Sequence, residues 1–356
     1  MTWISFAETC KRFSPMTADP ALRIVIAGSK LFAPTLTSVA AVVEEISNLH
    51  RVSVFAKYPE RHALAPSCFP ERLDYTKIAL WPQHFDLAHL FAGDTAQRVI
   101  EFLRPDFPIV ITCESGGDFT RRIQNPAMTQ LYEQLFARAS VTTFVHESIA
   151  RLVAKNCRFD QSRAEIFDPC LPLNVYPRAD VSAEASIAIV GREVPEKGRA
   201  QAEQLLARNP DFQRAWFIGT PPSDVRLDER FEYTGSIPHG DYLLLLSRCR
   251  LLLYIGATSG ERFDSLPTTF LEAFAIGVPV VSTPIQGVRE MARRFPLAIR
   301  LGETPAQLST HVSHILQNPP VTEDLSAYVC ERFSLRSLAR KFADCVYPRA
   351  LGVGDK

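Results

Sequence analysis

The chain has 356 residues, of which 46% are hydrophobic and 22% are charged. These values are ordinary for a globular protein and exclude disorder or a coiled coil as the main architecture. Lys plus Arg and Asp plus Glu each total 39, so no basic excess indicates a nucleic-acid partner or contact with an anionic membrane. A chain of this length is typical of two domains.

The sequence lacks long apolar segments and closely spaced cysteine pairs. The best candidate for a membrane span, residues 243–256, is interrupted by Arg248 and Arg250, and the first twenty residues hold no stretch like a signal peptide. None of the eight cysteines has C-x-x-C spacing, which argues against a zinc or redox site. We therefore expect a cytoplasmic protein without a bound metal.

The first half of the chain alternates strands and helices. Apolar runs predict strands over 23–28, 50–58, 86–93, 108–113 and 140–146, and helical spacing predicts helices over 37–49, 95–105 and 130–139. This alternation predicts an α/β fold, with a parallel sheet and crossover helices.

A second series of the same kind follows a polar stretch that contains proline, over 173–185. Its predicted strands are 186–191, 215–220, 231–235, 250–257 and 278–283, and its predicted helices are 198–210, 240–249 and 267–277. We expect an N-terminal extension (1–20), a first domain (21–174), a linker (175–185), a second domain (186–325) and a C-terminal helix (326–356) that crosses back to the first domain.

The stretch VGREVPEKG carries the first chemical signal. Gly191 ends a predicted strand, and Arg192 and Lys197 follow on the loop that enters a helix. Two cations beside a helix N-terminus suit a diphosphate, because the side chains supply charge and the helix supplies amides. A solvated loop, in which Glu193 and Glu196 pair with the two cations, is an equally good interpretation of this stretch alone.

The stretch DSLPTTFLEAFAIG carries a stronger signal. Pro267 suits a first helical turn, Asp264 comes just before that turn, and Glu272 lies one to two turns inside the helix. Asp264 could be a helix cap and no more. Apolar residues surround Glu272, however, so the helix is expected to be buried there, and an unpaired buried carboxylate would be costly. The two acids are therefore candidates to accept hydrogen bonds from sugar hydroxyls.

Together and in this order, the two stretches resemble the retaining GT-B glycosyltransferases of family 4, the glycosyl transferases group 1. The resemblance implies a GT-B fold of two Rossmann-like α/β/α domains that face a central cleft. It implies that Arg192 and Lys197 act on the donor diphosphate, that Asp264 contacts the donor sugar, and that Glu272 contacts the ribose. The other residues that the resemblance assigns to the donor are Gly191, Gly235, Ser236, Ile237, Ser265, Leu266, Pro267 and Thr268.

The N-terminal half departs from the family pattern. Many members carry His-Gly after the strand that corresponds to residues 108–113, and this chain has Ser115 in the His place. A histidine contact is then lost or supplied from elsewhere, and His146 is one candidate. The acceptor-side candidates are Ser115, Gly116, Gly117, Asp118 and His146.

The resemblance implies a retaining transfer of a hexose-like sugar from a nucleoside-diphosphate sugar, with UDP expected first and GDP second. Attack would come from the front face, and the leaving phosphate would help to remove the acceptor proton. The acceptor hydroxyl or amine stays open among small metabolites, polysaccharides and lipid-linked glycans. The sequence indicates no tightly bound cofactor, no nucleic acid and no peripheral membrane contact. Two alternatives remain: a nucleotide-sugar 2-epimerase of the same fold, and a catalytically inactive scaffold that binds sugar nucleotides.

Overall fold

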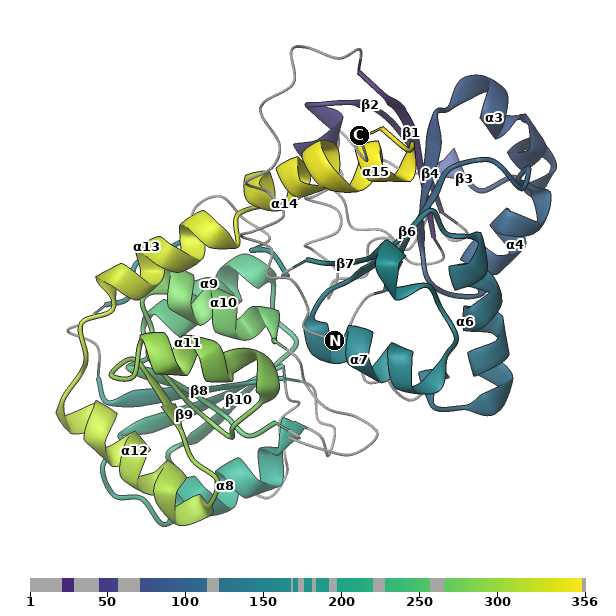
Figure 1. Cartoon of the computed structure of the whole chain (residues 1–356). Helices are drawn as coiled ribbons and strands as arrows, with labels where there is room; N and C mark the ends of the chain where they lie inside the picture. Colours follow the sequence, from purple (N-terminus) through teal and green to yellow (C-terminus); the bar gives the residue numbers. More distant parts are fainter. Residues whose placement is uncertain are drawn as a thin grey trace. The chain divides into compact units, whose positions relative to one another are not determined.

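The chain folds into two compact units, each built on its own parallel sheet (Figure 1). The computed structural model describes residues 21–28, 45–56, 71–113, 122–167, 169–171, 176–180, 184–191, 197–219, 228–256 and 266–353. Of these, the residues up to 171 and those from 335 onward form unit 1, and the residues from 176 to 334 form unit 2.

The sheet of unit 1 has seven parallel strands. In spatial order they are β3 (Glu71–Arg72), β2 (Arg51–Ala56), β1 (Arg23–Gly28), β4 (Leu87–Phe91), β5 (Ile109–Cys113), β6 (Val141–Phe144) and β7 (Ala164–Ile166). All residues of β5, with the sequence IVITC, are buried. Such a run is typical of a parallel strand that is covered on both faces.

The helices of unit 1 come from both ends of the chain. They are η4 (Tyr75–Leu80), α3 (Trp81–His84), α4 (Asp94–Phe102), α6 (Pro126–Arg138), α7 (Glu147–Asn156), η5 (Gln161–Arg163), α14 (Leu335–Lys341), the π-helix η8 (Phe342–Val346) and α15 (Tyr347–Ala350). Helices α4 and α6 pack side by side, and α15 packs against β5.

The sheet of unit 2 has six parallel strands. In spatial order they are β10 (Phe231–Gly235), β9 (Arg214–Ile218), β8 (Ser186–Val190), β11 (Leu251–Tyr254), β12 (Val280–Ser282) and β13 (Ile299–Leu301). The helices of unit 2 are α8 (Arg199–Ala207), α9 (His239–Ser247), α10 (Thr268–Ile276), η7 (Gln286–Val288), α11 (Arg289–Arg294), α12 (Pro305–Gln317) and α13 (Glu323–Arg332).

Helices cover both faces of the unit 2 sheet. Helices α8 and α12 lie on one face, and α9, α10 and α13 lie on the other (Figure 1). Phe217, Phe231 and Ile315 are fully buried in the core between the sheet, α8 and α12. The parallel sheets and the helices that cover them confirm the predicted α/β class. The strands predicted in each half are also present. The sequence missed β3, β7 and β13, which have only two or three residues each.

The C-terminal segment differs from the single helix that the sequence predicted over residues 326–356. Helix α13 ends at Arg332, and α14 begins at Leu335, in unit 1. The hydroxyl of Ser334 donates to the carbonyl of Glu331 at 3.2 Å, and such local bonds compete with helix continuation. Apolar periodicity continues across the break, which explains why the sequence predicted one helix.

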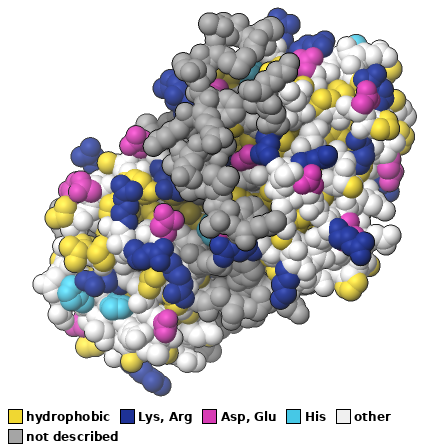
Figure 2. Space-filling view, viewed as in Figure 1, with side chains coloured by type: hydrophobic (Ala, Val, Ile, Leu, Met, Phe, Trp, Pro, Cys, Tyr) yellow, Lys and Arg dark blue, Asp and Glu magenta, His cyan; other side chains and the backbone are white. Residues whose placement is uncertain are grey.

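Charged side chains are mixed on the surface. On the face shown in Figure 2, Lys and Arg side chains of the described residues are interspersed with Asp and Glu, in keeping with their equal totals. Among the described residues, no helix combines the length and apolar character that a membrane crossing requires.

Candidate functional site

The sheet of unit 2 reverses its winding between β8 and β11, and two predicted site residues lie at this point. From β8 the chain builds outward through β9 and β10, then returns to add β11, β12 and β13 on the other side. Ligands in such sheets bind beyond the carboxyl ends of the strands at the reversal. Gly191 follows β8 here. The aliphatic chain of Lys197 lies over it, 3.5–3.6 Å from where a Cβ at Gly191 would be.

Lys197 is held at this edge by Tyr254, the last residue of β11. Its Nζ donates to the Tyr254 hydroxyl at 2.5 Å, and Tyr254 is buried. The next residue, Gly198, has a φ of 60°, and a Cβ there would lie 2.2 Å from the carbonyl oxygen of Ile255. Glycine is therefore required for this close approach to β11. Arg192, the predicted partner of Lys197, lies outside the described residues.

Three adjacent strands, β8, β9 and β10, end in or are followed by glycine, so these three positions add no side chains to the edge. The amide of Gly191 donates to the carbonyl of Ile218, and the amide of Gly219 donates to that of Gly235, both at 3.0 Å. A ligand can approach the backbone closely at such an edge. Gly191 and Gly235 were predicted site residues and Gly219 was not, although AWFIGT has the same pattern of a strand followed by glycine.

The head of α10 lies beside this edge. The rings of Tyr254 and Phe270 have centroids 4.9 Å apart, which joins β11 to the first turn of the helix. Pro267 is the N-cap, and no side chain among the described residues caps α10. The amides of such a first turn remain available to an anion. Of the residues predicted around this turn, the structure describes Leu266, Pro267 and Thr268, whereas Asp264 and Ser265 lie outside the described residues.

Glu272 is buried in α10, with 5% of its surface exposed. One carboxylate oxygen accepts from Nε2 of His239 at 2.7 Å, and the other accepts from the hydroxyl of Tyr242 at 2.9 Å. Burial, and then the nearby Glu272, raise the pKa of Tyr242 well above its usual value, so its hydroxyl remains a donor. We call these three side chains the glutamate cluster.

The sequence indicated a buried Glu272 but missed its two partners. His239 and Tyr242 lie three residues apart at the start of α9, so they share one face of that helix. That spacing was the available signal. The predicted turn residues Ser236 and Ile237 connect β10 to this helix. One edge of unit 2 therefore brings together Gly191, Lys197, Gly235, Ser236, Ile237, Leu266, Pro267, Thr268 and Glu272.

In unit 1 the structure describes one of the predicted acceptor-side residues. His146 is the N-cap of α7, just beyond the carboxyl end of β6, and its Nδ1 accepts from the amide of Ser148 at 3.1 Å. The other acceptor-side candidates, Ser115, Gly116, Gly117 and Asp118, lie outside the described residues.

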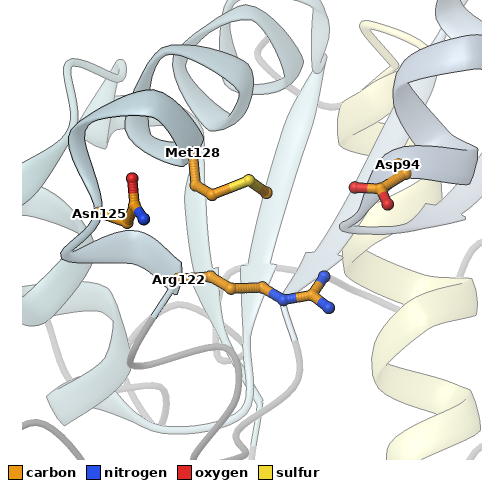
Figure 3. Close-up of a pocket in the computed structure, with 4 residues that line it drawn as sticks. All are labelled: Asp94, Arg122, Asn125 and Met128. Carbon is orange, nitrogen blue, oxygen red and sulfur yellow. The ribbon is translucent and has the colours of Figure 1, made fainter.

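Unit 1 also has a pocket of about 450 Å³ between the starts of α4 and α6. Its lining includes Asp94, Arg122, Asn125 and Met128, and Asp94 and Arg122 point toward one another (Figure 3). Burial raises the pKa of the nearby Tyr132 hydroxyl to about 12, and Arg122 opposes this rise. None of these residues was predicted from the sequence, although Asp94 comes shortly after the end of β4. Within the described parts of the chain, no group of three or more His, Cys, Asp or Glu side chains could hold a metal ion.

Residues 222–332 match the family profile of glycosyl transferases group 1. This part of the chain contains the whole glutamate cluster and Tyr254. The segment is similar to the glycosyl transferases group 1. The group named by the sequence resemblance is therefore confirmed for this segment, whereas Lys197 lies before it.

A curated relative also matches part of the chain. Over 152 residues the chain is 28% identical to a Bacillus subtilis (strain 168) protein named for teichuronic acid biosynthesis, glycosyltransferase TuaC. The match covers 40% of this chain and 37% of TuaC, so it spans little more than a third of that relative's length.

Two solved structures resemble nearly the whole chain. Anabaena HepE, solved in complex with UDP and glucose, has a TM-score of 0.66 at 14% identity and covers 92% of this chain and 99% of its own. Sucrose-phosphate synthase from Thermosynechococcus elongatus has a TM-score of 0.72 at 14% identity, with 94% and 100% covered. At this identity the likeness concerns the fold alone, and it confirms the predicted GT-B fold with its two Rossmann-like units.

Proposed function

We propose that the protein is a retaining glycosyltransferase that moves a hexose-like sugar from a nucleoside-diphosphate sugar to an acceptor hydroxyl or amine. The observation that carries this proposal is the buried carboxylate of Glu272 near the head of α10, in the segment that matches glycosyl transferases group 1. A buried carboxylate with unused lone pairs suits the hydroxyls of a ribose. UDP is the first candidate nucleotide of the donor, and the UDP that HepE binds in a similar fold supports it.

The proposed chemistry depends on the charge that grows on the diphosphate as the bond from sugar C1 to oxygen breaks. Lys197 and the first-turn amides of α10 would stabilise this charge, and so would Arg192. Asp264 would contact the donor sugar. Such groups accelerate transfer when they bind the transition state more strongly than the ground state. Front-face attack needs no covalent nucleophile on the protein, so we assign none.

The acceptor is proposed to be a glycan or a small hydroxyl compound that binds at the carboxyl edge of unit 1. The acceptor-side candidates are Ser115, Gly116, Gly117, Asp118 and His146. The name of TuaC supports an acceptor in polysaccharide synthesis.

A transfer assay tests the proposal. Wild-type protein is incubated with UDP-sugars and GDP-sugars and a panel of glycan acceptors, and release of the nucleoside diphosphate is measured. Lys197→Met should lose ten- to a hundredfold in turnover, about 1.5–3 kcal/mol of charge-assisted bonding. Lys155→Met, at an exposed lysine of α7, is the matched control and should retain full turnover.

The products separate the alternatives. An isomerised nucleotide sugar without acceptor would identify a 2-epimerase. Nucleotide binding without turnover across the panel would identify an inactive scaffold. Wild-type turnover in Lys197→Met would remove Lys197 from the donor site.

A further inference from the structure

Glu272 is held by two side chains whose environments differ. Tyr242 is buried with the carboxylate, whereas the His239 side chain is 34% exposed beside a Glu272 side chain that is 7% exposed. His239 is thus the member of the glutamate cluster that reaches from the buried carboxylate to the surface. A ligand that approaches Glu272 from solvent meets this side of the cluster.

The hydrogen bond between His239 and Glu272 has a fixed direction. An ionised carboxylate only accepts hydrogen bonds, so Nε2 of His239 carries the proton and donates to Oε1. The hydroxyl of Tyr242 donates to Oε2. Two donors from one face of α9 therefore fix the plane of the carboxylate. About four lone-pair sites belong to an ionised carboxylate, and the described residues use two of them, so about two remain for a ligand.

We infer that His239 is a positioning residue for the nucleotide, acting through Glu272. Its Nε2–H holds Oε1 so that the free lone pairs of the carboxylate face the two hydroxyls of a ribose. This inference rests on the proposed function, because it takes the ligand of Glu272 to be a nucleoside diphosphate. Without His239, the carboxylate loses one of the two bonds that orient it.

A purely structural role would give a different result. If His239 only joined α9 to α10, its removal would lower stability and leave nucleotide affinity unchanged. If it contacted the nucleotide directly, its removal would weaken binding whether or not Glu272 was present. A double-mutant cycle separates these roles, because residues that act through one another are not additive.

The experiment is a calorimetric titration of UDP, with GDP in parallel, into five proteins. They are the wild type, His239→Ala, His239→Gln, Glu272→Ala and the double variant His239→Ala/Glu272→Ala. We expect His239→Ala to weaken binding about tenfold, roughly one charge-assisted hydrogen bond. His239→Gln, which keeps an N–H donor, should stay within about threefold of the wild type. The double variant should bind as Glu272→Ala does.

Two controls keep the result interpretable. His314→Ala removes an exposed histidine from α12 in the same unit and should bind as the wild type does. Glu272→Gln replaces Glu272→Ala in the cycle if the alanine variant does not fold. In turnover, His239→Ala should raise KM for the donor and leave kcat nearly unchanged, because the lost bond is equal in the ground and transition states.

The outcomes distinguish this inference from the proposed function. Wild-type protein that binds neither nucleotide would overturn both. Wild-type protein that binds, with His239→Ala binding equally well, would overturn the inference alone. A tenfold loss that persists in the Glu272→Ala background would also overturn it, since His239 would then act without Glu272.

Discussion

A cluster of buried polar side chains lies in each unit, and the two clusters differ in how much hydrogen-bonding capacity they leave unused. In unit 1, His89 on β4 contacts the hydroxyl of Tyr347 at 3.0 Å and that of Thr112 at 2.6 Å, and Thr112 contacts Thr143 at 2.7 Å. Both ring nitrogens of His89 therefore have partners inside the unit. In unit 2, two donors meet a carboxylate that can accept about two more hydrogen bonds.

The difference shows how buried polar groups can serve either structure or binding. We call His89, Thr112, Thr143 and Tyr347 the histidine cluster. Burial lowers the pKa of His89 to about 3, so the ring is neutral and its partners are neutral hydroxyls. Such a network needs no ligand, and through Tyr347 it attaches the C-terminal segment to the sheet of unit 1. The glutamate cluster keeps unused acceptor capacity, as a binding site requires.

The largest expected effect comes from removing the centre of the histidine cluster. His89→Ala leaves a cavity and unpartnered hydroxyls, and should lower the free energy of unfolding by about 3–5 kcal/mol. Urea unfolding measures this loss, and hydrogen exchange at β4 and β5 assigns it to unit 1. Nucleotide affinity should not change.

The comparison variant is His239→Ala, at a half-exposed site. Its unfolding free energy should fall by less than about 1 kcal/mol. Equal losses in the two variants would contradict the distinction between the clusters.

The turn that carries Lys197 tests the same edge through the backbone. Gly198→Ala puts a Cβ 2.2 Å from the carbonyl oxygen of Ile255 at a φ of 60°. We expect a loss of about 2–4 kcal/mol in unfolding free energy and weaker nucleotide binding, because the turn must move. Gly240→Ala is the matched control: nothing lies within 4 Å of that Cβ, inside α9, so stability should stay equal or rise by up to about 1 kcal/mol. If Gly198→Ala left both the unfolding free energy and nucleotide binding unchanged, the close approach to β11 would not constrain the turn.

The buried imidazole predicts a pH dependence of stability. The ordinary pKa of His89, 6.5, is lowered to about 3 by burial. Between these values the unfolded chain binds a proton that the folded chain does not, so the unfolding free energy falls as the pH falls. This contribution is fully present above about pH 6.5, and about 2–3 kcal/mol of it should be lost by pH 4.5. Urea unfolding from pH 7.5 to 4.5 measures the slope, and His89→Gln should flatten it by that amount. Equal slopes in the two proteins would contradict a neutral buried His89.

The smallest effects come from a matched pair of tyrosines. Tyr347→Phe and Tyr242→Phe each remove one buried hydroxyl, and each should lose about 1–2 kcal/mol of unfolding free energy. Only Tyr242→Phe should also weaken nucleotide binding, by about three- to tenfold, because it frees one oxygen of Glu272. Calorimetry on both variants provides the test. A change of affinity in Tyr347→Phe would show that the histidine cluster is linked to the binding site.

Local pattern explains which parts of the site could be predicted. Gly191 and Gly235 end apolar runs that form strands, and Glu272 interrupts an apolar helix, so each had a signal in its own neighbours. Tyr254 had no such signal, and His239 had only its three-residue spacing from Tyr242. Their contacts with Lys197 and Glu272 join residues 57 and 33 positions apart, and they depend on how strands and helices pack.

The fold shows the same limit. Each α/β series could be predicted from alternating apolar runs, because every buried parallel strand carries that pattern. The hydrogen bond between His89 and Tyr347 joins residues 258 positions apart, so no local pattern predicts it. The break at Ser334, which separates α13 from α14, could not be predicted either, because the apolar periodicity continues across it.

The central claim is that the edge of unit 2 binds a nucleoside diphosphate. Thermal unfolding with UDP, GDP, ADP, CMP and dTDP, in wild type and in Lys197→Ala/Glu272→Gln, tests it most directly. One nucleotide, at about a hundred times its dissociation constant, should stabilise the wild type by about 2.7 kcal/mol and leave the double variant nearly unchanged. No shift with any nucleotide, or equal shifts in the two proteins, would contradict the claim.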